Sequence, residues 1–291
     1  MLPEAVSKAY EGFFMSSQQN PYPGAVTSMI SYGDRVQGFL AVPENQPGPF
    51  GAVVLGHERY GLVQHTLDLV AKFAAHGYIG LAPDMFSRWN GDKEALSRGD
   101  IRVSISDEDI RSYMGDSLDY LLAHRQVDPD RISAMGVCQS GDYPLVLNSV
   151  RHELAANIVV YGGAQARVWE VDENRPEPYE SILERVQAPV LGIWGEDDSV
   201  VSVEDMRRLR DVLESKRKTY EFTLFSGMPH GWMNSTMPGR YRPRESEQAW
   251  SMILEFMERA YAGGFPKERV VWRFQSDIAP DYDFTKKVRL A

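Results

Sequence analysis

The chain has 291 residues, with a hydrophobic content of 43% and a charged content of 25%, which are ordinary values for a soluble globular protein. Its formal net charge of −10 argues against a nucleic-acid-binding surface, which needs clustered basic residues, and no apolar run approaches the roughly 18–20 residues that span a bilayer. The start, MLPEAVSKAYEGFF, lacks the pattern of a secretory signal, and the single cysteine, Cys138, excludes an internal disulfide and favours a reducing cytoplasm.

Short runs rich in β-forming residues alternate with longer amphipathic stretches, which is the pattern of an α/β protein with a doubly wound, mostly parallel sheet. The first two strands are separated by Gly33 and Asp34, which predicts an antiparallel N-terminal hairpin. Ser202 followed by Asp205 predicts a helix-capping box. The predicted strands are 28–32, 36–42, 51–56, 78–82, 131–137, 156–161, 189–194 and 220–225. The predicted helices are 65–76, 107–126, 140–150, 203–215 and 244–261.

We predict one α/β domain over residues 1–291, because the chain contains no linker and no insertion long enough for a large cap domain. We expect residues 1–27 to form an N-terminal extension and residues 262–291 to form a C-terminal tail that packs back on the body. The polar connections 84–106 and 164–180 follow predicted strands, on the side where open α/β sheets bind ligands.

The stretch MGVCQSGDY (135–143) joins a predicted strand to a predicted helix and has the shape of a nucleophile elbow. Small residues, Gly136 and Ser140, flank Cys138 at the strained turn. If Ser140 were the nucleophile, its flanking residues would be Cys138 and Asp142, and an aspartate is neither small nor neutral. The pattern favours Cys138 as the nucleophile, with a buried inert cysteine as the alternative.

Two later segments supply partners for this thiol. GEDD (195–198) ends a predicted strand, and the Gly-x-x-Asp-x-x-Val spacing favours Asp198 over Asp197 as an orienting carboxylate. FSGMPHGWMN places His230 in a glycine-bearing loop after another strand, and His57 is its rival because it also ends a strand. The chain order nucleophile, acid, histidine is that of α/β-hydrolases.

These residue types suit nucleophilic acyl transfer. A histidine can take the thiol proton, and a carboxylate fixes the histidine tautomer. The backbone N–H of Gln139 is the first candidate donor to the oxyanion, and a second is expected from the loop after strand 51–56. The six histidines show no metal-ligand spacing, so we expect no metal and no cofactor.

Six short motifs occur in an order that is typical of one family. They are GHERYGL (56–62), APDMFSR (82–88), GVCQSG (136–141), VYGG (160–163), GEDD (195–198) and PHGWMN (229–234). Together they resemble the dienelactone hydrolase (carboxymethylenebutenolidase) family, and the resemblance covers roughly residues 30–260.

The resemblance implies roles for individual residues. The triad would be Cys138, His230 and Asp198. Glu58 would match the family glutamate that contacts the resting cysteine and helps control its protonation, with an ion pair to Arg59 as the alternative. The backbone N–H of Arg59 would match the second oxyanion donor.

The predicted substrate-binding residues are Arg88, Trp232 and Asn234, of which the resemblance implies the role of Arg88. Arg88 would bind the substrate carboxylate, with a solvated loop arginine as the alternative. Family members active on the diene lactone have a second arginine four residues after the catalytic histidine, and here that position is Asn234. Candidates to replace this arginine are Arg240, Arg242 and Arg244, with the start of a solvated helix as the alternative for this stretch. Three tryptophans close to the motifs predict an aromatic pocket surface: Trp89, Trp194 and Trp232.

The sequence therefore predicts a hydrolase that cleaves an ester or lactone bond of a small, carboxylate-bearing molecule through a Cys-His-Asp triad. A general carboxylesterase or thioesterase without a carboxylate requirement is the nearest alternative. A non-catalytic or redox-sensing binding protein on the same scaffold is the alternative from another class. The expected partner is a small-molecule ester or lactone, with no nucleic acid and no membrane, and either a monomer or a homo-oligomer fits the sequence.

Overall fold

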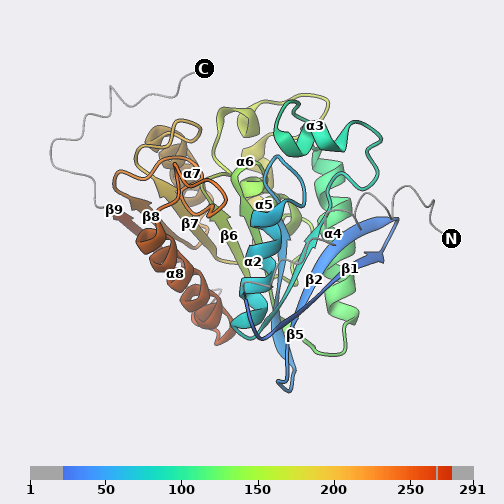
Figure 1. Ribbon diagram of the computed structural model, residues 1–291. Coiled ribbons are helices and arrows are strands. Elements are labelled where there is room, and N and C mark those ends of the chain that lie inside the picture. The colour runs from blue at the N-terminus through green and yellow to red at the C-terminus, as the bar shows by residue number, and fades with distance from the viewer. Residues whose placement is uncertain (1–21, 267, 277–291) are drawn as a thin grey trace.

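The computed structural model describes residues 22–266 and 268–276, which contain one nine-stranded sheet in the order β1-β2-β4-β3-β5-β6-β7-β8-β9 (Figure 1). The strands are β1 (Ala25–Tyr32), β2 (Val36–Pro43), β3 (Phe50–Gly56), β4 (Tyr78–Pro83), β5 (Val127–Val137), β6 (Ala156–Val160), β7 (Val190–Gly195), β8 (Tyr220–Phe225) and β9 (Trp272–Ser276). β1 pairs antiparallel with β2, and β2 antiparallel with β4, whereas every other neighbouring pair is parallel. The predicted N-terminal hairpin and mostly parallel sheet are confirmed.

Helices cover both faces of this sheet (Figure 1). The α-helices are α2 (Gln64–Ala75), α3 (Lys93–Arg98), α4 (Asp107–Ala123), α5 (Tyr143–Asn148), α6 (Tyr179–Arg185), α7 (Val203–Ser215) and α8 (Pro243–Tyr261). Two short 3₁₀ helices are η1 (Cys138–Asp142) and η2 (Ala166–Trp169). One apolar layer packs α2 and α8 against the sheet, and the other layer packs α4, α5, α6 and α7.

Strand β3, which lies between β4 and β5, contributes side chains to both apolar layers. Its side chains alternate, so that Val53 and Leu55 join the layer of α2 and α8, whereas Ala52 and Val54 join the opposite layer. All four are completely buried. A strand that is buried on both faces needs a continuous apolar run, which the sequence FGAVVLG provides.

The predicted elements agree with the structure to within a few residues, with some exceptions. The helix expected at 140–150 is a 3₁₀ turn, η1, followed by the short helix α5. Helices α3 and α6 and strand β9 were not predicted. The capping box at α7 is confirmed, because Ser202 accepts a hydrogen bond from the Asp205 N–H and the Asp205 carboxylate accepts one from the Ser202 N–H.

The two ends of the chain are only partly described. Residues 1–21 of the predicted extension lie outside the described residues, and β1 begins at Ala25. Within the predicted tail, β9 pairs in parallel with β8, so this part of the tail extends the sheet, and residues 277–291 lie outside the description.

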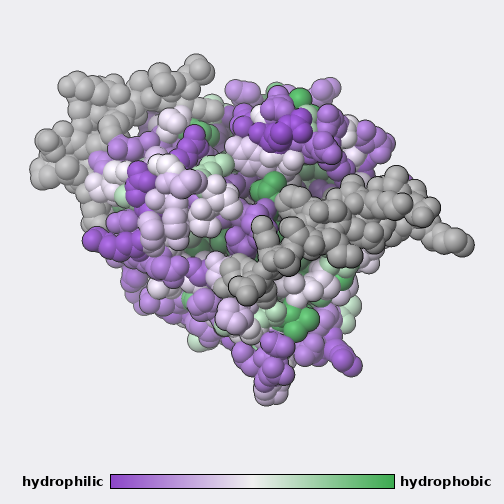
Figure 2. Space-filling view, in the orientation of Figure 1, coloured by the Kyte–Doolittle hydropathy of each residue, from purple (hydrophilic) through white to green (hydrophobic). Residues whose placement is uncertain are grey.

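The surface over the described residues is mostly polar. Figure 2 shows a largely hydrophilic face with small, separate hydrophobic spots. The large apolar side chains exposed among the described residues are scattered along the chain, at Val26, Ile101, Val150, Val171 and Trp272. No helix in the described part is long and apolar enough to cross a membrane.

Candidate active site

Cys138 lies at a strained turn directly after the central strand β5. Its φ of 59° places a non-glycine residue in the left-handed region, which costs about 1–3 kcal/mol and persists only where the surroundings impose it. A Cβ on Gly136 would overlap the carbonyl oxygen of Ser140, and a Cβ on Gly162 would overlap the carbonyl oxygen of Cys138. Gly136 and Gly162 therefore let neighbouring backbone segments approach the turn closely, and the turn directs the thiol out of the sheet.

Ser140 fastens this turn and is not available as a nucleophile. Its hydroxyl donates to the Val137 carbonyl at 3.0 Å and accepts from the Val137 N–H at 2.9 Å. The Ser140 side chain is completely buried, whereas Cys138 is partly exposed. Of the two candidate nucleophiles, only Cys138 faces open space.

Three side chains from different loops form a continuous hydrogen-bonded line. The His230 Nε2 lies 3.0 Å from the Cys138 Sγ, and the His230 Nδ1 lies 2.8 Å from the Asp198 Oδ2. The Asp198 Oδ1 also accepts hydrogen bonds from the N–H groups of Val200 and Val201, at 2.7 and 2.9 Å, which fix the carboxylate. The structure thus brings together the nucleophile, base and acid that the sequence predicted.

The electrostatic surroundings of His230 favour its charged form. Burial lowers the pKa of this imidazole, but hydrogen bonds to Asp198 and Cys138 outweigh the burial and raise the pKa to about 10. A protonated imidazole donates from both ring nitrogens, which suits a carboxylate on one side and a sulfur on the other.

This pKa shift predicts a pH-dependent stability. Below the ordinary histidine pKa of 6.5, the folded and unfolded states both carry the proton, and the stabilisation of protonated His230 is fully present. Between 6.5 and about 10 the unfolded chain loses its proton first, so the stabilisation disappears as the pH rises. We expect wild type to lose at least about 1.4 kcal/mol more than His230→Asn between about pH 6 and about pH 9, in urea unfolding.

The control for this measurement is His76→Asn, which replaces an exposed histidine. Its unfolding free energy should change with pH as that of the wild type does. An equal change in wild type and His230→Asn would contradict a strongly favoured imidazolium in the folded protein.

Glu58 is held beside the triad by two uncharged donors. Its carboxylate is 3% exposed and accepts from the Asn234 amide at 3.0 Å and from the Tyr161 hydroxyl at 3.4 Å. Glu58 makes no ion pair with Arg59, whose guanidinium lies 4.6 Å from the centre of the Tyr60 ring. In this structure the Cys138 thiol is hydrogen-bonded to His230. The carboxylate of Glu58 is hydrogen-bonded to Asn234 and Tyr161 instead of to the thiol.

Tyr161 is a site residue to which the sequence reasoning gave no role, although the VYGG motif contains it. Burial raises the pKa of Tyr161 well above its usual value, and the negative charge of Glu58 adds to this, so the hydroxyl remains a neutral donor. The ring meets His230 edge-on at 5.3 Å between centroids. Tyr161 therefore contacts both the glutamate and the histidine of the site.

His57, the rival histidine, has a structural role. Its Nδ1 lies 2.6 Å from the Glu58 carbonyl, and its Nε2 lies 3.0 Å from the Met85 backbone N. Burial lowers the pKa of His57, so the ring is neutral, donates to the carbonyl and accepts from the Met85 N–H. These bonds tie the loop after β3 to the loop after β4.

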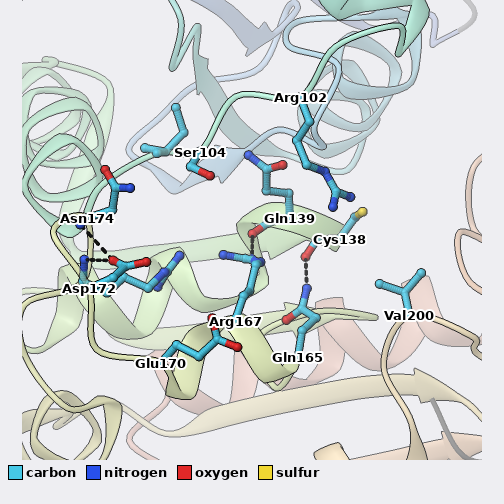
Figure 3. A pocket seen from close by; sticks show the side chains of 12 residues that line it. Arg102, Ser104, Cys138, Gln139, Gln165, Arg167, Glu170, Asp172, Asn174 and Val200 are labelled. Atoms are coloured by element: carbon cyan, nitrogen blue, oxygen red, sulfur yellow. Dashed lines mark hydrogen bonds between the residues drawn. The ribbon is translucent and has the colours of Figure 1, made fainter. Parts of the chain in front are cut away.

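Two cavities meet at Cys138. The larger has a volume of about 490 Å³, and the residues that line it include Glu58, Arg59, Tyr60, Arg102, His230 and Arg240. The smaller has a volume of about 110 Å³, and the residues that line it include Arg102, Gln139, Gln165, Arg167 and Arg175. Figure 3 shows the smaller cavity, with the Arg102 side chain directed toward Cys138. Among the described residues, no group of three His, Cys, Asp or Glu side chains could hold a metal ion.

None of the three predicted substrate-binding residues is among those that line the two cavities. Arg88 is absent from the residues that line the two cavities, because its guanidinium lies over the Tyr113 ring at 3.9 Å and bonds to Ser112. Trp232 is completely buried against Phe225, so its predicted place in the pocket is wrong.

Asn234 is buried as well, and it contacts Glu58 rather than the cavity. The aromatic pocket is also corrected, since Trp194 is buried and bonds to the Gly162 carbonyl, and Tyr60 is the single aromatic residue among those described as lining the two cavities.

A buried ionic network supports the smaller cavity. Asp142, four residues after Cys138, is completely buried and binds Arg167 at 3.0 Å and Arg175 at 2.8 Å. Burial raises the pKa of Asp142, but the two guanidiniums outweigh it and hold the pKa below its usual value. Arg167 also donates to the Gln139 carbonyl at 2.5 Å, so this network extends to the residue after the nucleophile.

Replacing Arg175 by glutamine is expected to lower the free energy of unfolding by about 3 kcal/mol, because it leaves buried negative charge on Asp142 without its closest cation. Urea unfolding measures this loss. The control Arg185→Gln removes the partly exposed ion pair with Glu177 and should cost less than about 1 kcal/mol. Equal losses in the two variants would show that the buried network contributes no more than a surface pair.

The architecture and the site together define a class. A strand that ends in a strained cysteine on a doubly wound sheet, with a histidine and an aspartate aligned behind it, is the arrangement of an α/β-hydrolase. The model of the dienelactone hydrolase family matches residues 36–261. The chain therefore belongs to the dienelactone hydrolase family, and it is a carboxylic ester hydrolase. The resemblance carried by the six motifs is confirmed.

Individual relatives are distant in sequence. A Salmonella typhimurium protein named "Putative carboxymethylenebutenolidase" is 24% identical over 243 residues, which cover 82% of this chain and 87% of the relative. A Klebsiella pneumoniae structure titled "Putative Dienelactone Hydrolase" has a TM-score of 0.70 at 20% identity, covering 81% of this chain and 99% of that one. A dienelactone hydrolase-like promiscuous phosphotriesterase from metagenomic libraries has a TM-score of 0.66 at 22% identity, with the same coverage. The structural matches support the fold.

Proposed function

We propose that the chain hydrolyses an ester or lactone bond of a small, carboxylate-bearing molecule, with Cys138 as the nucleophile. The observation that carries the proposal is the unbroken line from the Cys138 sulfur through His230 to Asp198, with separations of 3.0 and 2.8 Å. Such a line supplies a thiolate, a proton carrier and a group that fixes the carrier's tautomer.

The first half of the reaction forms an acyl-enzyme. The Cys138 sulfur attacks the substrate carbonyl while the thiol proton resides on His230, and the carbonyl oxygen becomes an oxyanion. The backbone N–H groups of Gln139 and Arg59 donate to this oxygen, since Gln139 is in the first turn of η1 and Arg59 follows β3 on the wall of the larger cavity. As the oxyanion collapses, the ester C–O bond breaks and His230 gives its proton to the leaving alkoxide.

The second half releases the acid. His230 takes a proton from a water molecule, whose oxygen attacks the thioester carbonyl. The C–S bond then breaks, the carboxylic acid leaves, and the proton returns to the Cys138–His230 pair. A lactone follows the same steps, except that its alcohol stays attached to the acyl group.

Glu58 has an electrostatic role in this proposal. A buried carboxylate beside the nucleophile disfavours a second negative charge, so a thiolate forms readily only when His230 carries the proton. This limits oxidation of the resting sulfur, which requires thiolate character. The proposed location is the cytoplasm, because a catalytic thiol must stay reduced and the cytoplasm is a reducing compartment.

Turnover of matched substrates tests the function. Wild type and Cys138→Ala are assayed on a lactone, a thioester and aryl esters with and without a carboxylate. We expect turnover that depends on Cys138 and is faster for the carboxylated esters. Equal rates with and without the carboxylate would favour a general carboxylesterase or thioesterase. A stoichiometric covalent label on Cys138 with no turnover of any substrate would favour the non-catalytic or redox-sensing alternative.

A further inference from the structure

Three arginines from separate segments line the larger cavity together with Cys138 and His230. Arg59 follows β3, Arg102 lies between α3 and α4, and Arg240 lies in the loop between His230 and α8. The net charge of the whole chain is −10, whereas the wall of this small cavity carries three cationic side chains.

These three guanidiniums have no carboxylate within ion-pair distance among residues 22–266 and 268–276. Arg167 and Arg175, which line the smaller cavity, are different because both bind Asp142. Arg167 and Arg175 are therefore paired with a buried carboxylate. The three arginines of the larger cavity form no ion pair with a described carboxylate.

The three side chains share the cavity wall with Cys138 and His230. Arg102 is directed toward Cys138 and lines both cavities (Figure 3). The Arg240 Nη1 lies 4.0 Å from the position of a Cβ on Gly231, the residue after His230. Arg59 lies over the Tyr60 ring at the wall of the same cavity.

The charges around this cavity select the occupant. Glu58 is the acidic residue among those described as lining it, and the carboxylate of Glu58 is bonded to Tyr161 and Asn234. The charge of protonated His230 is balanced by its partner Asp198. The guanidiniums of Arg59, Arg102 and Arg240 and the carboxylate of Glu58 then leave two positive charges, which a group with two negative charges balances. A guanidinium binds carboxylate or phosphate through paired N–H donors, and a volume of about 490 Å³ suits a small molecule.

We propose that the larger cavity binds a substrate group with two negative charges, either a phosphate or a pair of carboxylates, next to the bond that Cys138 cleaves. The inference rests on the proposed function, because it defines the substrate class of that site. Arg102 and Arg240 determine the specificity, and Arg59 adds its charge at the wall.

A set of p-nitrophenyl esters with similar acyl chains tests the charge requirement. The butyrate ester is neutral, the glutarate ester keeps one carboxylate, the tricarballylate ester keeps two, and the 4-phosphonobutyrate ester carries a phosphonate. At about pH 8 and low salt, we expect kcat/KM for one of the doubly charged esters to exceed that of the glutarate ester by about tenfold or more, since each added hydrogen bond to a guanidinium is charge-assisted. Comparison of the last two esters identifies which doubly charged group the site takes.

Variants show whether the named arginines cause the preference. Arg102→Gln and Arg240→Gln should each lower the ratio of kcat/KM for the doubly charged ester to that for the butyrate ester by about tenfold. Arg244→Gln is the matched control, because Arg244 is 90% exposed and pairs with Glu245 outside the cavity, and the ratio should stay at the wild-type value.

Direct binding separates this inference from the proposed function. Calorimetric titration of Cys138→Ala should give tighter binding of glutarate or inorganic phosphate than of butyrate, and the added Arg102→Gln change should abolish the difference. Arginine-dependent binding without ester turnover by wild type would support the anion site and contradict the proposed function. Cys138-dependent turnover that is faster for the glutarate ester than for the butyrate ester, with no further gain for the doubly charged esters and no effect of the arginine variants, would overturn the anion site and leave the proposed function standing.

Discussion

Replacing Cys138 by alanine is expected to lower kcat/KM for ester hydrolysis by about 10⁴-fold or more, because the Cys138 sulfur is the nucleophile hydrogen-bonded to His230, which in turn contacts Asp198. Rate enhancements that remain in such a variant come from binding and from the oxyanion donors. The variant should lose no more than about 1 kcal/mol of unfolding free energy, because the thiol is partly exposed and packs only at the margin of the apolar layer of α2 and α8.

Ser140→Ala is the matched variant of the same turn. It removes two hydrogen bonds to the Val137 backbone and should cost about 1–2 kcal/mol of unfolding free energy, while most of the hydrolysis remains. The reverse pattern, with an active Cys138→Ala and an inactive but folded Ser140→Ala, would show that the elbow is built around the serine.

Gly136→Ala is expected to be the most damaging change to the fold of the elbow. The new Cβ would overlap the Ser140 carbonyl oxygen, which is backbone and cannot move without opening the turn. We expect a loss of about 3 kcal/mol in urea unfolding, together with a large loss of kcat, because the Cys138 sulfur no longer meets His230.

Gly239→Ala provides the control for this backbone argument. Nothing lies within 4 Å of a Cβ at Gly239, so its unfolding free energy should stay within about 0.5 kcal/mol of the wild type. If Gly136→Ala were as stable and active as Gly239→Ala, the close approach at the elbow would have no energetic consequence.

The sequence predicted the sheet and the Cys138–His230–Asp198 line because both depend on local patterns. Strands buried on both faces are continuous apolar runs, and the elbow is recognised by small residues around Cys138. Asp198 and His230 each follow the end of a strand, where parallel topology brings loops from distant segments together.

The walls of the cavities were predicted less well, since long side chains on loops take directions that only tertiary packing decides. Arg88 is on the expected loop, but its guanidinium packs over Tyr113 of α4 rather than toward Cys138. Trp232 follows His230 by two residues and turns into the core. No local pattern distinguishes Arg102, which lines both cavities, from the other exposed arginines.

Strand β9 and the short helices α3 and α6 were missed for a related reason. α3 and α6 have six and seven residues, too few for a helical period to show clearly. β9 exposes four of its five side chains and is a strand because its backbone pairs with β8. Pairing of this kind is a property of the neighbouring strand as much as of the sequence itself.

The most direct test of the central claim is to trap the acyl group. His230→Gln mixed with p-nitrophenyl butyrate should accumulate a covalent intermediate, because the thiol is still acylated slowly while water has lost its general base. Intact-mass measurement should show one butyryl group per chain, and peptide mapping should place it on Cys138. A butyryl group on Ser140, or wild-type turnover with no acyl group on Cys138 at any time, would contradict the account.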